Sequence, residues 1–326
     1  MSLTAIIPVW NGREWLERLL VSLDAQTQPA AEILAIDNGS SDGAPELALS
    51  RGARVIPMGR NAGFAAAVNR GIEESRGDWI AVLNSDVELA PDYFAALLAS
   101  ATDRNAWFAT GKILTAGTTD RLDGTFDLLC RGATAWRTGS GQADGPAFSV
   151  PREICSAPWT AAIFRAELFH RVGLLEEGFE SYLEDVDFGL RCGLQGFAGV
   201  YEPSAVAWHR GSASLGKWHP ETVRRMARNQ VWLAARHFPP RYWWPVLVAQ
   251  LLWGCVAFRH GAGAAWLRGK WAGLRGFRQA REAVGQAAPL DALLRENEDT
   301  IYALQSAAGF DLYWRLYFFL TQGEAK

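Results

Sequence analysis

The sequence predicts an α/β fold in which a mainly parallel central sheet is flanked by helices, with a helical region after it. Over roughly the first hundred residues, short apolar runs alternate with segments of helical periodicity, which is the pattern of consecutive strand–helix units. From about residue 221 onward the periodicity is helical throughout. We therefore expect two parts, residues 1–220 and residues 221–326.

Polar loops follow the predicted strands. The strands are expected at residues 3–9, 32–37, 53–58, 79–84 and 159–165. Helices are expected around Leu16, Leu19, Leu20 and Leu23 and at residues 63–75, 166–172 and 184–194. Residues 114–157 are rich in Gly, Thr and Asp without periodicity, and we expect irregular connections there. Because open α/β sheets bind ligands at the carboxyl ends of their strands, the loops after the first, second and fourth strands form the candidate site.

The composition excludes several classes of protein. A hydrophobic fraction of 49% over 326 residues can form a sizeable core, so disorder is not expected. The four cysteines lie far apart without a CxxC pair, which indicates buried thiols in a reducing compartment rather than a zinc or iron–sulfur site. The N-terminus has no basic segment followed by a long apolar stretch, so we expect no signal peptide and a cytoplasmic location.

A cationic, tryptophan-rich segment occupies residues 224–281, with 11 Lys or Arg, six Trp and no Asp or Glu. Within it, residues 243–258 carry no charge and lie between Arg241 and Arg259. This run is slightly short for a membrane span and is typical of a helix that lies on anionic lipid. A buried core helix, a dimer contact and a true span are the alternatives. No nucleic-acid-binding module is recognisable, so no nucleic acid partner is expected.

The first candidate binding group lies after the first two strands. Its members are Pro8, Val9, Trp10, Asn11, Asp37, Asn38 and Ser40. An Asp at such a strand end can accept a hydrogen bond from a pyrimidine base, while Asn, Ser and loop amides can bind ribose and phosphate oxygens. The alternative is an ordinary Asx-turn. The glycine-rich fingerprints of dinucleotide-binding folds and of P-loop ATPases are absent.

Two further groups are placed to bind anions and metal. Asn61, Gly63, Phe64 and Asn69 lie at the start of a helix whose free amides would face an anion, unless they only cap the helix. Asn84, Ser85 and Asp86 follow an apolar strand, where a carboxylate would suit a hard divalent cation completed by diphosphate oxygens and water. His209 could add a nitrogen ligand suited to Mg²⁺ or Mn²⁺. In isolation, Asp86 could be a helix cap and His209 a structural residue.

Three carboxylates open the predicted helix at residues 184–194. They are Glu184, Asp185 and Asp187. The helix dipole favours anions there, while mutual repulsion and partial burial could raise the pKa of one carboxyl to that of a useful base. Acidic residues in a first turn are also ordinary capping.

Together these motifs resemble family 2 glycosyltransferases of the GT-A fold, over about residues 2–220. The motifs that carry the resemblance are residues 6–12, 37–43, 61–64, 83–87, 178–179 and 184–187. The resemblance implies that Asp37 contacts the base and that Asp185 is the catalytic base. It also implies that Asp86 is the last acid of the DxD motif and that His209 helps to hold metal or diphosphate. Asn84 replaces the first DxD acid, as in bacterial rhamnosyltransferase-like members.

The implied activity is transfer of a sugar, with inversion, from a nucleotide-diphosphate donor to an acceptor hydroxyl, assisted by Mg²⁺ or Mn²⁺. The resemblance favours dTDP-rhamnose and leaves UDP-sugars open. We expect Trp159 and Glu184 at the acceptor site, a lipid-linked or polysaccharide acceptor, and a peripheral location on the inner face of the cell membrane. A catalytically silent sugar-nucleotide-binding scaffold is the main alternative, and a nucleotidyltransferase is another. The oligomeric state is open, a homo-oligomer included.

Overall fold

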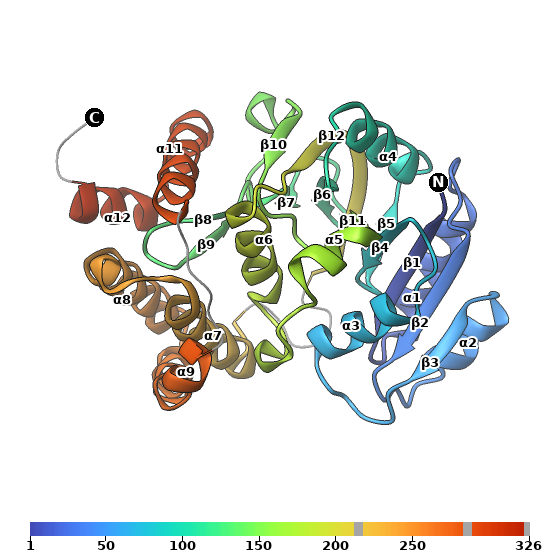
Figure 1. Cartoon of the computed structure of the whole chain (residues 1–326), viewed down its shortest axis with the longest axis horizontal. Coiled ribbons are helices and arrows are strands. Elements are labelled where there is room, and N and C mark those ends of the chain that lie inside the picture. The colour runs from blue at the N-terminus through green and yellow to red at the C-terminus, as the bar shows by residue number, and fades with distance from the viewer. Residues whose placement is uncertain (212–217, 283–288, 323–326) are drawn as a thin grey trace. The chain divides into compact units, whose positions relative to one another are not determined.

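The computed structural model describes residues 1–211, 218–282 and 289–322. The chain forms two units (Figure 1). The first comprises Met1–Asp127 and Gly139–Ser214, and the second comprises Leu128–Thr138 and Leu215–Lys326. A short segment from the middle of the chain therefore belongs to the C-terminal unit, which no pattern in the sequence indicated.

The parallel half of the central sheet contains the four strands predicted first. They are β1 (Leu3–Val9), β2 (Glu32–Asp37), β3 (Arg54–Pro57) and β4 (Trp79–Leu83), in the order β4-β1-β2-β3. The connecting helices are α1 (Arg13–Asp24), α2 (Ala44–Ser50) and α3 (Phe64–Glu74). Ile7 packs into the core that contains α1, while Ile6 faces Gly71 of α3. Both faces of β1 are thus covered, which explains its continuous apolar sequence.

The other half of the sheet adds antiparallel pairs. Its strands are β5 (Val87–Leu89), β6 (Phe108–Thr115), β7 (Leu122–Gly124), β10 (Arg152–Ile154), β11 (Ala161–Arg165) and β12 (Gly199–His209). β12 runs parallel to β6, whereas β11 is antiparallel to both β4 and β6. The prediction of irregular structure at residues 114–157 was wrong in part, because strands of three residues occur there. Strands this short show no sequence period. The α/β class with flanking helices is confirmed.

The remaining helices of the first unit lie around this sheet. They are α4 (Tyr93–Asp103), α5 (Ala166–Val172) and α6 (Glu184–Leu194), with the short 3₁₀ turns η1 (Pro146–Phe148) and η2 (Glu177–Phe179). The bounds of α5 and α6 are those that the sequence predicted. Strand β12 was not predicted, because Pro203 and Ser204 and a register shift between Glu202 and Val206 interrupt its pattern.

The second unit is helical, as expected. Its helices are α7 (Pro220–His237), η3 (Pro240–Tyr242), α8 (Trp243–Arg259), α9 (Gly263–Arg275), α10 (Phe277–Glu282), α11 (Leu290–Ala308) and α12 (Leu312–Gln322), joined by the hairpin β8 (Asp127–Leu129) and β9 (Ala135–Arg137). Glycines bring α9 close to α7, since a Cβ at Gly269 would lie 2.3 Å from the Arg224 carbonyl oxygen. Within the described residues, no helix combines the length and apolar character needed to cross a membrane.

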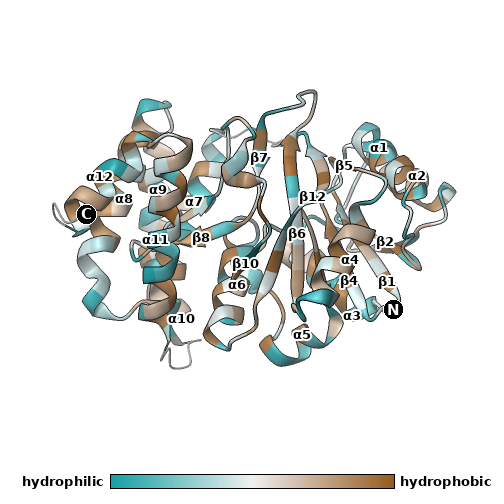
Figure 2. Ribbon diagram, turned by 90° about the horizontal axis from the view of Figure 1, so that it is seen from above, coloured by the Kyte–Doolittle hydropathy of each residue, from teal (hydrophilic) through white to brown (hydrophobic). Residues whose placement is uncertain are grey.

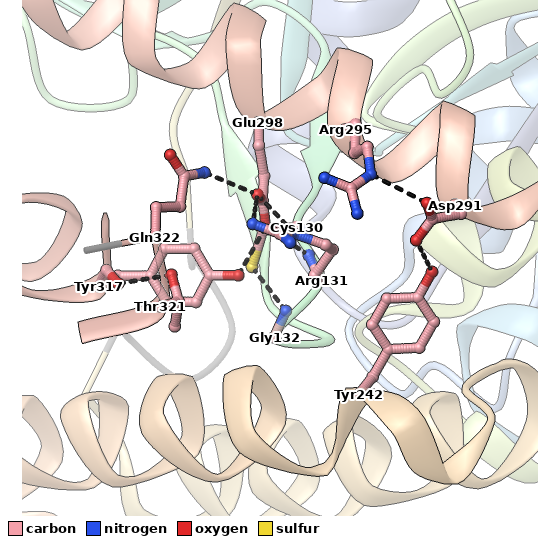
Figure 3. A network of polar contacts seen from close by, with 10 residues as sticks. All are labelled: Cys130, Arg131, Gly132, Tyr242, Asp291, Arg295, Glu298, Tyr317, Thr321 and Gln322. Carbon is pink, nitrogen blue, oxygen red and sulfur yellow. Dashed lines mark hydrogen bonds and ion pairs between the residues drawn. The ribbon is translucent and has the colours of Figure 1, made fainter. Parts of the chain in front are cut away.

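One buried carboxylate joins the hairpin to the last two helices (Figure 3). Glu298 of α11 accepts hydrogen bonds from the backbone N–H of Arg131 at 2.9 Å and from its Nε at 2.8 Å. The same carboxylate accepts from the Tyr317 hydroxyl at 2.6 Å and from Gln322 Nε2 at 3.0 Å. Glu298 is only 2% exposed, so these partners replace the water that its charge has lost.

A half-buried lysine forms a second polar contact inside the helical unit. Lys270 of α9 donates to Gln230 Oε1 of α7 at 2.7 Å and also to Gln250 Oε1 of α8. Gln250 in turn donates to the Gly132 carbonyl oxygen of the hairpin at 3.2 Å. Burial lowers the pKa of the Lys270 ammonium to about 7, because both acceptors are neutral amides.

This lowered pKa predicts how stability depends on pH. Between pH 7 and the ordinary lysine value near 10.5, the unfolded chain binds a proton that the folded chain lacks, so the free energy of unfolding rises with pH. We expect wild-type stability, measured by urea unfolding relative to Lys270→Met, to rise by about 1 kcal/mol per pH unit from pH 7 to 9. The exposed Arg268→Met on the same helix is the control and should leave the slope unchanged. Parallel curves for wild type and Lys270→Met would contradict the assignment.

Candidate active site

The loops after β1 and β2 are joined by hydrogen bonds, as the parallel pairing of these strands requires. The Asn38 amide donates to the Val9 carbonyl oxygen at 2.7 Å, and the Asn11 amide donates to Ser40 Oγ at 3.0 Å. Asp37 Oδ1 accepts from the Ser40 amide at 2.8 Å, which closes the turn at the end of β2. These predicted donor-binding residues are therefore brought together at one edge of the sheet.

Two other members of this group are accessible beside these loops. Pro8 is half-buried near the end of β1, and Trp10 exposes 41% of its surface. An exposed indole next to a polar loop offers a flat surface on which a base or sugar could stack.

Asn38 also connects β2 to the start of α3. Its side chain is buried, donates to Asn61 Oδ1 at 3.2 Å and to the Gly63 carbonyl oxygen at 3.1 Å, and accepts from the Ala62 amide at 2.8 Å. The Gly63 amide donates to Asn61 Oδ1 at 3.0 Å. Asn61 and Gly63 thus lie beside the β1 and β2 loops, where Asn38 holds them, and donor binding by these two residues stays a prediction.

The first turn of α3 contacts the segment that precedes α6. The Ala65 amide donates to the Glu180 carbonyl oxygen at 3.0 Å, and the Phe64 amide donates to Ser181 Oγ at 3.4 Å. These amides therefore bind protein oxygens, where the sequence led us to expect an anion. Gly63 has a φ of 93° and lies against the backbone of Glu180. A Cβ at this position would be only 2.8 Å from the Glu180 carbonyl oxygen.

Asn69 of α3 also binds the chain before α6, at Leu175 and Glu177. Its side chain is buried, and it exchanges two hydrogen bonds with the backbone of Leu175, at 2.9 and 3.0 Å. It also donates to Glu177 Oε1 at 3.1 Å. The structure thus places Asn69 away from solvent, and direct contact of Phe64 or Asn69 with the donor stays a prediction.

A strained backbone segment leads into α6. Glu180, Tyr182 and Leu183 have φ values of 61°, 74° and 70°, in the left-handed region that non-glycine residues rarely adopt. Such conformations cost free energy and are concentrated at functional sites. Gly63 and Ala65 help to hold this segment through Glu180, so α3 and the start of α6 form one connected structure.

The three carboxylates at the start of α6 have different surroundings. Asp187 is fully buried and forms an ion pair with Arg191 Nε at 3.0 Å, while Glu184 is also buried. Asp185 is half-buried, and its Oδ1 accepts a hydrogen bond from the Val186 amide at 2.9 Å. Asp185 is therefore the carboxylate of the three that combines partial exposure with a fixed orientation.

A histidine and two carboxylates meet after β4. β5 pairs with the end of β12, which places His209 opposite Val87 and next to Asp86. His209 Nε2 lies 3.2 Å from Asp86 Oδ1, and His209 Nδ1 lies 2.9 Å from Asp123 Oδ2. Asn84 Nδ2 is 3.5 Å from His209 Nε2, and Ser85 lies half-buried in the same turn. The predicted metal ligands are thus neighbours.

Asp123 was not predicted, because it lies in a three-residue strand, β7, within a segment that shows no period. Its carboxylate orients the imidazole by binding Nδ1, which directs Nε2 toward Asp86. Burial disfavours the imidazolium, but the hydrogen bonds to Asp123 and Asp86 prevail and raise the pKa of His209 to about 9.

The chemistry of Asp86 and His209 would suit a divalent cation whose remaining ligands come from a phosphate group and water. Within the described residues, no group of three or more His, Cys, Asp or Glu side chains is arranged to hold a metal ion. Asp86 and His209 could supply two ligands, and a cation of the Mg²⁺ type commonly takes one or two protein ligands and completes its shell with substrate phosphates and water. The imidazole would have to lose its proton to act as a ligand.

The two residues expected at the acceptor site are buried. Trp159 is 2% exposed, and its ring lies 4.5 Å from that of Phe164 and 5.1 Å from that of Phe188. It belongs to an aromatic core that lies next to α6. Acceptor contact by Trp159 or Glu184 stays a prediction that this structure does not support directly.

Solved structures with a similar fold include sugar transferases. A crystal structure of GalNAc-T7 with UDP, GalNAc and Mn²⁺ matches with a TM-score of 0.63 and 16% identity, over 95% of this chain and 58% of that chain. The chain therefore spans less than two thirds of that protein. The mannosyltransferase PcManGT from Pyrobaculum calidifontis, in complex with GDP-Man and Mn²⁺, matches with a TM-score of 0.52 and 16% identity, over 97% and 85% of the two chains. Both show that the fold is GT-A-like.

Sequence comparison gives the family. The N-acetylglucosaminyl-diphospho-decaprenol L-rhamnosyltransferase of Mycobacterium tuberculosis is 30% identical over 299 residues, which cover 79% of this chain and 92% of the relative. The sequence model of the family described as "Glycosyl transferase family 2" matches residues 4–173, which is more than half of the chain. This protein therefore belongs to glycosyltransferase family 2 and is rhamnosyltransferase-like.

Proposed function

We propose that this glycosyltransferase moves a sugar, with inversion, from a nucleotide-diphosphate donor to a hydroxyl of a lipid-linked saccharide. The observation that carries the proposal is the contact between Asp86, which follows β4 beside β1, and His209 at the end of β12, with His209 Nε2 3.2 Å from Asp86 Oδ1. dTDP-rhamnose is the first candidate donor, because the mycobacterial relative is named as a rhamnosyltransferase. Its named acceptor, N-acetylglucosaminyl-diphospho-decaprenol, makes a polyprenyl-diphosphate-linked sugar the first candidate acceptor.

The donor would lie across the loops after β1 and β2. Asp37 would accept the imide N–H of the pyrimidine base, and Asn11 and Ser40 would contact the ribose. Trp10 would stack at the exposed side. These roles use side chains that the structure gathers at one edge of the sheet.

The reaction would be one displacement. The acceptor oxygen forms a bond to the anomeric carbon while the bond from that carbon to the diphosphate oxygen breaks, and the bonding pair leaves with the nucleoside diphosphate. Asp185 takes the proton of the acceptor hydroxyl. A divalent cation held by Asp86 and His209 would supply Lewis-acid stabilisation of the leaving diphosphate. The Arg210 amide donates to the Asp86 carbonyl oxygen at 3.1 Å, and its guanidinium lies 3.7 Å from the centre of the Trp15 ring.

Asp123 and Asn69 would act as positioning residues. Asp123 orients His209, and Asn69 fixes the segment that precedes Asp185. A lipid-linked acceptor would also place the protein at the inner face of the cell membrane as a peripheral protein.

A nucleotide-binding panel tests the donor site. We expect dTDP, compared with UDP and GDP, to raise the melting temperature of the wild type, and Mn²⁺ to increase this rise, because a ligand that binds only the folded state stabilises it. Asp86→Ala should lose the Mn²⁺-dependent part and weaken nucleotide binding in the presence of Mn²⁺ by roughly 10- to 100-fold. Asp92→Ala, an exposed acid at the start of α4, is the matched control and should behave as wild type. No Mn²⁺-dependent shift with any of the three nucleotides would rule out the proposed metal-assisted site.

A further inference from the structure

Helix α8 exposes an apolar stripe along its whole length. Trp243, Leu247, Leu251 and Phe258 are each between 43% and 64% exposed, and Cys255 lies exposed in the same row. Their spacing of three or four residues places them on one side of the helix. Pro245, Val248, Ala249, Gly254 and Ala257 form the buried side. The larger apolar side chains thus point outward and the smaller ones inward. A helix on the surface of a water-soluble protein normally turns its large apolar side chains toward the core instead.

Helices α9 and α12 show similar exposed rows. On α9, Leu267, Trp271 and Leu274 are more than half exposed, and the exposed Arg268 and Arg275 lie beside them. The Arg275 guanidinium lies 5.1 Å from the centre of the Trp271 ring. On α12 the exposed apolar residues, again at helical spacing, are Leu312, Leu316, Phe319 and Leu320.

The three helices are neighbours, with α8 between the other two. Trp244 Nε1, at the start of α8, donates to the Leu320 carbonyl oxygen of α12 at 2.9 Å. Gly254 of α8 packs against the ring of Trp266 on α9, where a Cβ would be 2.7 Å from the indole. In Figure 2, which is coloured by hydropathy, the brown stretches on α8 and α12 are their hydrophobic residues. The exposed apolar residues of these helices together are called the apolar face below.

The charged residues of α8 and α9 have one sign. Residues 224–281, which include α8 and α9, carry 11 Lys or Arg and no Asp or Glu. Large exposed apolar side chains gathered on neighbouring helices, as here, indicate an interaction site. A second copy of the chain would bring Arg268 and Arg275 toward their own counterparts, so like charges oppose self-association through this face. An anionic partner meets no such opposition.

We propose that the apolar face is a docking surface for an anionic lipid bilayer, with α8, α9 and α12 lying in the plane of the interface. Leucine and phenylalanine side chains would enter the acyl boundary, tryptophan rings would lie at the headgroup level, and arginines would pair with lipid phosphates. The biological purpose of this docking rests on the proposed function, since it would hold the enzyme at the membrane that contains a lipid-linked acceptor. Binding to vesicles does not depend on the donor site.

Vesicle co-sedimentation of the full chain tests the docking surface. We expect wild-type protein to bind phosphatidylcholine vesicles containing phosphatidylglycerol at least about tenfold more tightly than pure phosphatidylcholine vesicles, with weaker binding at high salt. The double variant Leu251→Glu/Trp271→Glu should bind roughly 30- to 100-fold less tightly, because it places two charges in the apolar face. Both positions are exposed, so the fold should be kept.

Leu49→Glu is the matched control, since Leu49 is an exposed leucine on α2 in the other unit. It should bind vesicles as the wild type does. Equal binding by the double variant, or no binding of wild type to anionic vesicles, would overturn the proposal. So would a wild-type dimer that the double variant abolishes without any lipid binding, because the face would then join two copies. Nucleotide-induced melting shifts of the double variant report separately on the donor site, so the two proposals fail independently.

Discussion

Asp185→Asn is expected to lower the turnover number by roughly 10²- to 10⁴-fold while the fold and the affinity for nucleotide stay unchanged. The amide has almost the same shape as the carboxylate but cannot accept a proton, so the acceptor hydroxyl would lose the group that we propose as its base. The variant can keep the hydrogen bond that Oδ1 accepts from the Val186 amide. Initial rates of sugar transfer, measured with saturating donor, check the expectation.

The neighbouring Asp187→Asn separates chemistry from folding. Asp187 is fully buried and paired with Arg191, so its variant should lose stability and should retain turnover in the molecules that fold. If Asp185→Asn transferred sugar at the wild-type rate, Asp185 would not be the base. If neither the wild type nor the variant transferred sugar but both bound nucleotide, the protein would be a silent sugar-nucleotide-binding scaffold.

Glu298→Ala is expected to lower the free energy of unfolding by about 3–5 kcal/mol, the cost of breaking a buried ion pair from one side. The change leaves the charged Arg131, whose side chain is only 14% exposed, without its carboxylate partner. It also removes the acceptor of Tyr317 and Gln322, and so loosens the hairpin and α12 at once (Figure 3). Urea unfolding followed by tryptophan fluorescence measures the difference.

Glu296→Ala is the control for this change, since Glu296 is exposed on the same helix and should alter stability by less than about 0.5 kcal/mol. Replacing both members of the pair, as Arg131→Met with Glu298→Leu, should restore much of the loss, because no buried charge is then left alone. Equal unfolding midpoints for Glu298→Ala and the wild type would show that the carboxylate contributes nothing to the unit.

The sequence predicts the part of the fold that local patterns determine. β1 and β4 are continuous apolar runs because both faces of the sheet are covered, and β1, α5 and α6 have the predicted bounds. The three-residue strands and β12 could not be predicted, because a strand that short or interrupted shows no period. Membership of residues 128–138 in the helical unit depends on contacts with Glu298 and Gln250, which are distant in sequence.

The candidate site was predictable to the extent that strand ends determine it. Asn11, Asp37 and Asn38 meet because β1 and β2 are parallel neighbours. The pairing of β5 with β12, which brings His209 to Asp86, depends on a long-range register that no local pattern reveals. The sequence could not tell which acid of α6 is accessible, since burial separates Asp185 from Asp187. Asp123 and the apolar rows of α9 and α12 became visible only in three dimensions.

The position of Glu298 in the chain has a consequence for biosynthesis. Arg131 is made 167 residues before the carboxylate that neutralises it, and Tyr317 and Gln322 are made later still. During synthesis, Arg131 must therefore remain hydrated while the chain after it is being translated. The first unit contains its own sheet and can form during this interval, but the contacts of Glu298 with Tyr317 and Gln322 can form only after those residues have been made. The apolar face proposed as a docking surface includes α12, so it would be completed only after the residues of α12 have been made.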